Sequence, residues 1–202
     1  VGALSLQTTE PATIFNCTFI KNIAREGGGA IYIKSYDGIS IEKFGCIDNC
    51  TISQCVFQSN NDLSNNGHAI YFKNREGCST KLIIEDNCIF TGIGCNDDDN
   101  NTGYEILVNS TEFVFEDSKI EYPSNNNLNP GIEIRNNCIN SRIQNIQFIN
   151  ANVNVLDGDV SFNDCMFKFY DSCSVVDITT EQACVIENCS FNKCFSKIGG
   201  AI

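Results

Sequence analysis

Three consecutive acidic residues, Asp97, Asp98 and Asp99, form the strongest candidate cation site in this sequence. Carboxylate oxygens are the ligands that Ca²⁺ prefers. Calcium-dependent cleavage of an acidic polysaccharide would also need a basic side chain as base or substrate clamp. Lys81, Arg135 and Arg142 are candidates for that role, although no motif marks any of them. Because an acidic run flanked by asparagine is more often a solvated loop, we favour that interpretation and expect no bound cofactor.

His68 is the only histidine, so a nucleophilic triad would have to use it as the general base. No nucleophile-elbow sequence accompanies it. Polygalacturonase-like enzymes place a group of aspartates before a Gly-His pair and an Arg-x-Lys phrase. Here Gly67 and His68 precede the aspartates, and no Arg-Ile-Lys follows. His68 also stands where Gly29 and Gly200 stand in a repeated phrase, so we interpret it as a turn residue that replaces glycine.

The thirteen cysteines, an odd number, could form disulfides or bind zinc. Cys46, Cys50 and Cys55 have spacings that a zinc site could use, but there is a single histidine and no Cys-x-x-Cys pair. Structural thiols and disulfides are therefore favoured over a metal, and the pairing of the cysteines stays open.

Five of the cysteines precede a phenylalanine by two residues. Residues i and i+2 of a strand point to the same face, so these cysteines face inward if the phenylalanines do. We expect a ladder of buried thiols that behave as small hydrophobic side chains. The pairs are Cys17 with Phe19, Cys55 with Phe57, Cys88 with Phe90, Cys165 with Phe167, and Cys189 with Phe191.

A glycine phrase recurs along with the Cys-x-Phe phrase. Residues 28–31 and 199–202 both read Gly-Gly-Ala-Ile, and residues 67–70 read Gly-His-Ala-Ile. Such repetition is typical of stacked repeat proteins, here with a unit of about 20 to 28 residues that loops extend in places. In the middle of the chain, the place of Cys-x-Phe is taken by Ser-Lys-Ile at residues 118–120 and by Ile-Gln-Phe at residues 146–148. Aligned on Gly-x-x-Ile, the units end at Ile31, Ile70, Ile106, Ile134 and Ile202, with degenerate members near Val155 and Val176.

The composition favours strands, because Ile, Val and Phe dominate the apolar residues and Asn, Asp and Gly supply turns. A β-sandwich would not require the same phrase at the same place in each unit. A parallel β-helix would, since equivalent side chains stack in coils about 4.8 Å apart. We therefore predict an all-β, pectin-lyase-like parallel β-helix of roughly seven irregular coils, with residues 1–202 forming one segment of a longer repeat protein.

Polar segments mark the expected turns of this β-helix. Runs of Asn, Asp, Ser, Gly and Pro at residues 62–66, 96–103 and 123–130 predict exposed loops. An asparagine that precedes a cysteine suits a turn in which amide side chains stack, and this pattern occurs at Asn16, Asn49, Asn87 and Asn188. Glycosylation sequons in a secreted protein compete with that role, and the acceptor candidates outside the pattern are Asn100 and Asn109.

The net charge of -12 comes from 25 acidic and 13 basic residues. Such a surface repels phosphate backbones, so nucleic acid is excluded as a partner class. No stretch of the sequence is apolar over the length needed to span a bilayer.

The Gly-Gly-Ala-Ile phrases, with Phe-x-x-Asn at residues 19–22 and 57–60, resemble the repeats of chlamydial polymorphic outer membrane proteins and similar trichomonad surface proteins. Glu105, Glu133 and residues 153–156 depart from that pattern. The resemblance implies a right-handed β-helix at the cell surface or outside the cell, without catalytic activity, serving adhesion or as a scaffold. Expected partners are adjoining coils of the same longer chain, a second copy, or a host-cell, matrix or glycan ligand. The alternative left open is a polysaccharide lyase or glycoside hydrolase acting on acidic glycans.

Overall fold

The computed structural model describes residues 2–7, 10–34, 49–64, 66–74, 80–92, 104–109, 111–123, 130–169 and 175–194. Every regular element within these ranges is a β-strand. The strands are two to seven residues long. Short strands of β-branched and aromatic residues, separated by Asn, Asp and Gly, are what this composition favours.

Three parallel sheets of seven strands make up the fold, and the chain passes from sheet A to sheet B to sheet C in each repeat. Sheet A contains β1 (Leu4–Leu6), β5 (Ile31–Lys34), β9 (Ile70–Lys73), β12 (Ile106–Asn109), β15 (Pro130–Arg135), β18 (Asn152–Val155) and β21 (Val176–Ile178). Sheet B contains β2 (Ala12–Phe15), β6 (Cys50–Ser53), β10 (Lys81–Glu85), β13 (Glu112–Glu116), β16 (Cys138–Gln144), β19 (Gly158–Asn163) and β22 (Val185–Glu187). Sheet C contains β3 (Thr18–Ile20), β7 (Val56–Gln58), β11 (Ile89–Thr91), β14 (Lys119–Glu121), β17 (Gln147–Ile149), β20 (Met166–Lys168) and β23 (Ser190–Asn192).

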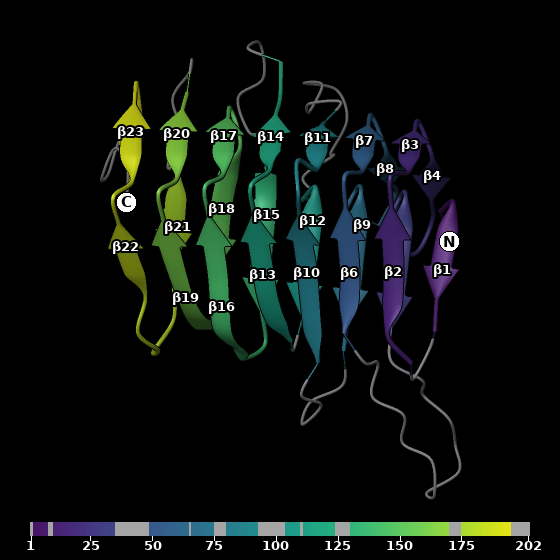
Figure 1. Cartoon of the computed structure of the whole chain (residues 1–202), viewed down its shortest axis with the longest axis horizontal. Helices are drawn as coiled ribbons and strands as arrows, with labels where there is room; N and C mark the ends of the chain where they lie inside the picture. Colours follow the sequence, from purple (N-terminus) through teal and green to yellow (C-terminus); the bar gives the residue numbers. More distant parts are fainter. Residues whose placement is uncertain are drawn as a thin grey trace, which may run out of the picture.

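One strand from each sheet forms a coil, and we number the coils 1 to 7 from the N-terminus. Figure 1 shows the coils side by side along the long axis, with β1 at one end and β22 and β23 at the other. Every strand pairs in parallel with its equivalent in the next coil, and a short extra pair joins β4 (Ile23–Ala24) to β8 (Asn61–Asp62). The predicted parallel β-helix is therefore confirmed.

In every coil a left-handed residue turns the chain from sheet B into sheet C, and in coil 3 the residue before it, Asp86, is left-handed as well. These residues have φ between 47° and 64°, a region that Asn and Asp tolerate better than other non-glycine residues. Gln54 is the one member of the row that is neither Asn nor Asp. The row consists of Asn16, Gln54, Asn87, Asp117, Asn145, Asp164 and Asn188.

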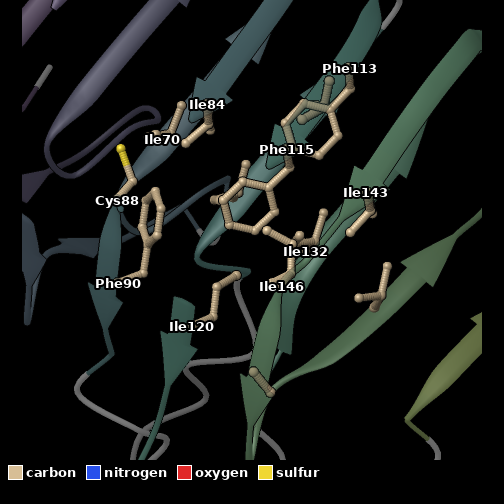
Figure 2. Packing of buried hydrophobic residues seen from close by; sticks show 14 of the residues in the cluster. Ile70, Ile84, Cys88, Phe90, Phe113, Phe115, Ile120, Ile132, Ile143 and Ile146 are labelled. Atoms are coloured by element: carbon tan, nitrogen blue, oxygen red, sulfur yellow. The ribbon is translucent and has the colours of Figure 1, made fainter. Parts of the chain in front are cut away.

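Inward side chains from the three sheets fill the interior and form one continuous core. Figure 2 shows this packing in the middle coils, where Phe90, Phe115 and Ile132 come from sheets C, B and A. Along sheet C the rings form two stacks on either side of Ile120, with centroids 4.5 to 5.1 Å apart and interplanar angles of 2° to 6°. The stacks are Phe19, Phe57 and Phe90, then Phe148, Phe167 and Phe191.

The register of sheet A corrects the alignment of the middle repeats. Ile106 pairs with Ile132, whereas Ile134 pairs with Val108. Aligning Ile134 with Ile106 is therefore wrong by two residues. The physical reason is that Ile132 and Ile134 are both fully buried on the same face of β15, so the apolar pattern does not distinguish them. A register shift between Pro130 and Ile132 displaces the glycine that the alignment used.

Two polar positions also differ from expectation. Asn49 precedes β6 in sheet B, so it does not belong to the left-handed row that Asn16, Asn87 and Asn188 occupy. Asp62 is fully buried, although it begins a segment expected to be an exposed loop. Its carboxylate accepts hydrogen bonds from the backbone N–H groups of Gly27, at 2.9 Å, and Asn66, at 2.7 Å. These bonds stabilise the turn from inside.

The glycine phrases mark places where adjacent coils approach closely. Gly28 and Gly67 have φ of 59° and 78°, and a Cβ at either would collide with the carbonyl of the isoleucine three residues later. A Cβ at Gly29 would collide with the carbonyl oxygen of His68 in the next coil. Only glycine fits both the turn and the close contact.

Candidate functional site

The candidate cation ligands Asp97, Asp98 and Asp99 lie outside the described residues, as does the glycosylation candidate Asn100. Asn109 is half-buried at the end of β12, and its side-chain oxygen accepts a hydrogen bond of 2.9 Å from Asn136. The described residues contain no cluster of three or more His, Cys, Asp or Glu arranged to hold a metal ion. Nor do they contain a helix long and apolar enough to cross a membrane.

The Cys-x-Phe pairs line the interior where sheet B turns into sheet C. Cys55, Cys88 and Cys165 are buried, whereas Cys17 and Cys189, in the first and last coils, are half-buried. The backbone N–H of Cys17 lies 3.4 Å from the sulfur of Cys55, and the N–H of Cys55 lies 3.4 Å from the sulfur of Cys88. The nine cysteines among the described residues are free thiols.

Burial makes the interior thiols of this ladder, Cys55, Cys88 and Cys165, poor nucleophiles. It raises the pKa of Cys88 and Cys165 to about 12 and also raises the pKa of Cys55. The thiolate, which is the reactive and metal-binding form, is therefore scarce at neutral pH. The ladder contributes packing and weak hydrogen bonds, and Figure 2 shows one of its members, Cys88, beside Phe90 in the core.

His68 is buried in the turn between coils 2 and 3. Its Nδ1 accepts a hydrogen bond of 3.1 Å from the backbone N–H of Asp62, the residue that organises the same turn. The backbone N–H of His68 donates to the carbonyl of Tyr104 in coil 4, at 2.6 Å. The imidazole therefore supports the turn from the position that glycine occupies in coil 2.

The outward face of sheet A carries an aromatic and basic group that we call the platform: Tyr32, Lys34, Tyr71 and Lys73. In the register of β5 and β9, Tyr32 lies beside Tyr71 and Lys34 beside Lys73. The tyrosine rings stack with centroids 5.3 Å apart. Ile31 and Ile33 alternate with these residues and are fully buried, so the platform faces away from the core.

Farther along sheet A, a polar cluster joins coils 4 to 6. Glu133 forms an ion pair with Arg135, and only 3% of the Glu133 side chain is exposed. Asn154 donates a hydrogen bond of 2.9 Å to the Tyr104 hydroxyl and approaches the Glu133 carboxylate at 3.4 Å. Burial raises the pKa of Tyr104 to about 12, and the Glu133 carboxylate adds to the rise.

Glu105 is a second buried carboxyl, in the turn that leads into β12. The Tyr122 hydroxyl donates a hydrogen bond of 3.1 Å to its Oε2, while Oε1 has no hydrogen-bond partner in the structure. Burial raises the pKa of Glu105 to about 8, and the Tyr122 bond offsets part of that rise. Glu105 is therefore mostly protonated at neutral pH, and a protonated carboxyl is less costly to bury than a carboxylate.

In the sequence, Glu105 and Glu133 stand out only because they depart from the repeat pattern. Neither carboxyl is accessible to a polymer in solution, because Glu105 and Glu133 are 1% and 2% exposed. The three basic side chains considered as base or clamp also have acidic partners: Lys81 with Glu112, Arg135 with Glu133, and Arg142 with Glu116. Within the described ranges, the platform is an outward group whose side chains are half-buried or exposed, so a large ligand can reach it.

No protein-family model matches this chain, and no curated protein or solved structure matches it significantly. The resemblance to chlamydial and trichomonad surface repeats therefore stays a prediction.

Proposed function

We propose that this chain is a non-catalytic, surface-displayed β-helix segment that acts in adhesion, and that the platform contacts an acidic glycan. The observation that carries the proposal is the register of β5 and β9, which places two stacked tyrosines beside two lysines on one outward face. The coils behind them form a rigid support because the sheet A, B and C strands of coils 2 to 6 are paired on both sides. Scaffolding is the role that remains if this face binds nothing.

The chemistry of the platform fits a sugar acid better than a neutral or basic ligand. Tyrosine rings offer flat apolar faces with a polar tip, and the apolar face of a sugar ring can pack against them. Lys34 and Lys73 add positive charge in a protein whose net charge is -12. An acidic group on the sugar would therefore be attracted to this face and repelled by most of the remaining surface.

Binding of the intact chain to immobilised acidic polysaccharides, neutral polysaccharides and matrix proteins tests the proposal. We expect binding to acidic polysaccharide that weakens with salt. Y71A should weaken it by about tenfold or more, and Y71F should preserve it because the ring remains. The matched control is I83A, a truncation on the outward face of sheet B in the same coil.

Equal binding by Y71A and I83A, with both proteins folded, would contradict a role for the platform. No binding to any of these ligands would contradict adhesion and leave the scaffold role. Calcium-dependent cleavage of the polysaccharide, lost in D98A, would replace both roles with the lyase or hydrolase alternative.

A further inference from the structure

Basic side chains continue along the outward face of sheet A beyond the platform. The pairing of β5, β9, β12 and β15 aligns four outward residues in what we call the basic row: Lys34, Lys73, Asn109 and Arg135. Figure 1 shows β9, β12 and β15 in adjacent coils along the long axis. Neighbouring strands lie about 4.8 Å apart, so Arg135 is about 10 Å beyond Lys73 along that axis. Positive charge therefore extends from coil 2 to coil 5.

The Arg135 guanidinium is held in the basic row by a buried acid. Its Nε pairs with Oε1 of Glu133, and only 3% of the Glu133 side chain is exposed. The other oxygen of that carboxylate, Oε2, accepts a hydrogen bond of 3.4 Å from Asn154 in coil 6. The Arg135 side chain itself is 40% exposed. Because the ion pair engages Nε, the terminal nitrogens of the guanidinium are left to donate to a ligand.

The platform and Arg135 belong to one electrostatic surface. Burial and the neighbouring Tyr32 raise the pKa of Tyr71, and the charge on Arg135 offsets part of that rise. The guanidinium therefore acts on the platform from two coils away.

Acidic side chains border the basic row. In coil 7, Asp177 is exposed on the outward face of sheet A. In coils 3 and 4, the ionisable outward side chains of sheet B are one lysine and three glutamates: Lys81, Glu85, Glu112 and Glu116. An acidic polymer that crossed from sheet A to sheet B would therefore meet repulsion, whereas one that follows the basic row is attracted along its length.

We propose that an acidic polysaccharide lies lengthwise on sheet A, parallel to the long axis, with one sugar packed on the platform and the carboxylate of a later sugar bound by Arg135. This inference rests on the proposed function and adds the direction of the ligand, its minimum length and the side chain that selects a carboxylate. A guanidinium matches a carboxylate with two parallel hydrogen bonds, which the lysines of the platform cannot make. A disaccharide stacked on both tyrosines ends short of Arg135, whereas a hexasaccharide extends past it.

Isothermal titration calorimetry of the full 202-residue chain with size-fractionated oligomers of polygalacturonate and alginate tests the lengthwise site. We expect affinity to rise from the disaccharide to the hexasaccharide. R135A should weaken hexasaccharide binding by about tenfold or more and leave disaccharide binding unchanged. R135K keeps a cation beside Glu133, which protects the fold, and should still weaken hexasaccharide binding because lysine lacks the planar fork. Circular dichroism establishes that each variant is folded.

The matched control is R142A. Arg142 lies on the outward face of sheet B in coil 5, and its Nε also pairs with a glutamate, Glu116. Its removal should leave the affinity unchanged at every length. In the native chain, the NMR signal of the Arg135 Nε–H group should shift with the hexasaccharide and not with the disaccharide, a response that a purely structural arginine would not give.

The outcomes separate this inference from the proposed function. Hexasaccharide binding that Y71A weakens but R135A and R135K leave intact would overturn the lengthwise site while the platform stands. Affinity that does not rise with length would do the same. If no oligomer binds, or if neither Y71A nor R135A changes binding, the proposed function fails and this inference fails with it.

Discussion

At the scale of single residues, this β-helix keeps a titratable group inside its core. Glu105 is fully buried, with one oxygen bound by the Tyr122 hydroxyl, and its pKa is raised to about 8 by burial. An ordinary glutamate has a pKa of about 4.3, so folding takes up a proton at neutral pH. The free energy of unfolding is thereby linked to pH.

We predict that the native chain loses stability as pH rises from 5 to 8. Between the unfolded and folded pKa values the native state binds more protons than the unfolded state, so the free energy of unfolding falls as pH rises, by about 4 kcal/mol at most over this range. E105Q has a side chain that stays neutral at every pH. It should therefore lose the part of the pH dependence of stability that Glu105 contributes. Urea unfolding at several pH values measures the difference between the two proteins. The control is E187Q, at an exposed position in β22, which should keep the pH dependence of the native chain. If E105Q also keeps that pH dependence, Glu105 is not its source.

The thiol ladder leads to a prediction about reactivity. Cys55, Cys88 and Cys165 are buried, and Cys17 and Cys189 are half-buried. Alkylation of the folded chain should therefore be faster at the two end positions than at the three interior ones, because reaction needs both access and a thiolate. Time-resolved labelling with peptide mapping gives each rate. Labelling of Cys88 as fast as that of an unfolded cysteine would show that the core opens readily.

At the scale of elements, each turn from sheet B to sheet C depends on a left-handed residue. Gln54, with φ of 54°, is the member of that row that is neither Asn nor Asp. Placing a non-glycine residue in the left-handed region costs about 1 to 2 kcal/mol of conformational free energy. The cost is lower for asparagine, because its short polar side chain can hydrogen-bond locally. This row is therefore a place where the sequence can be improved.

We expect Q54N to raise the free energy of unfolding by roughly 0.5 to 1 kcal/mol. The same substitution at Gln58, an exposed residue within β7, should lower stability slightly, since asparagine is depleted in strands. Equilibrium denaturation of both variants provides the comparison. Equal effects of the two substitutions would mean that the left-handed conformation carries no cost here.

The sequence predicts the elements better than it predicts the register that joins them. The Cys-x-Phe phrases, together with Ser118 and Ile146 as substitutes, identify the sheet C strands because each phrase occurs once per coil. The sheet A strands of the middle coils contain alternating apolar residues with no such marker, so the sequence pattern places Ile134 two residues out of register. The bond between Tyr122 and Glu105 joins residues from different turns, and no local pattern specifies such a pair.

At the scale of the whole molecule, the coils form a ladder whose rungs lie across the long axis (Figure 1). The hydrogen bonds between coils therefore point along that axis, and the described N- and C-terminal strands lie at its opposite ends. Coil lengths vary: 38 residues separate Cys17 from Cys55, and 33 separate Cys55 from Cys88, whereas Ser141 lies 160−141=19 residues before its partner Val160. The difference in length lies between the strands, and the strands of adjacent coils remain paired.

This orientation has a mechanical consequence. A pull applied to the two ends loads the hydrogen bonds of one junction at a time in tension, so the stack should peel coil by coil instead of shearing as a unit. Each step releases at most about 140 Å of chain for a 38-residue coil and about 70 Å for a 19-residue coil. Single-molecule force spectroscopy should record a series of unequal steps, where a cooperative fold would give a single rupture. A tether built this way would lengthen under load and stay attached.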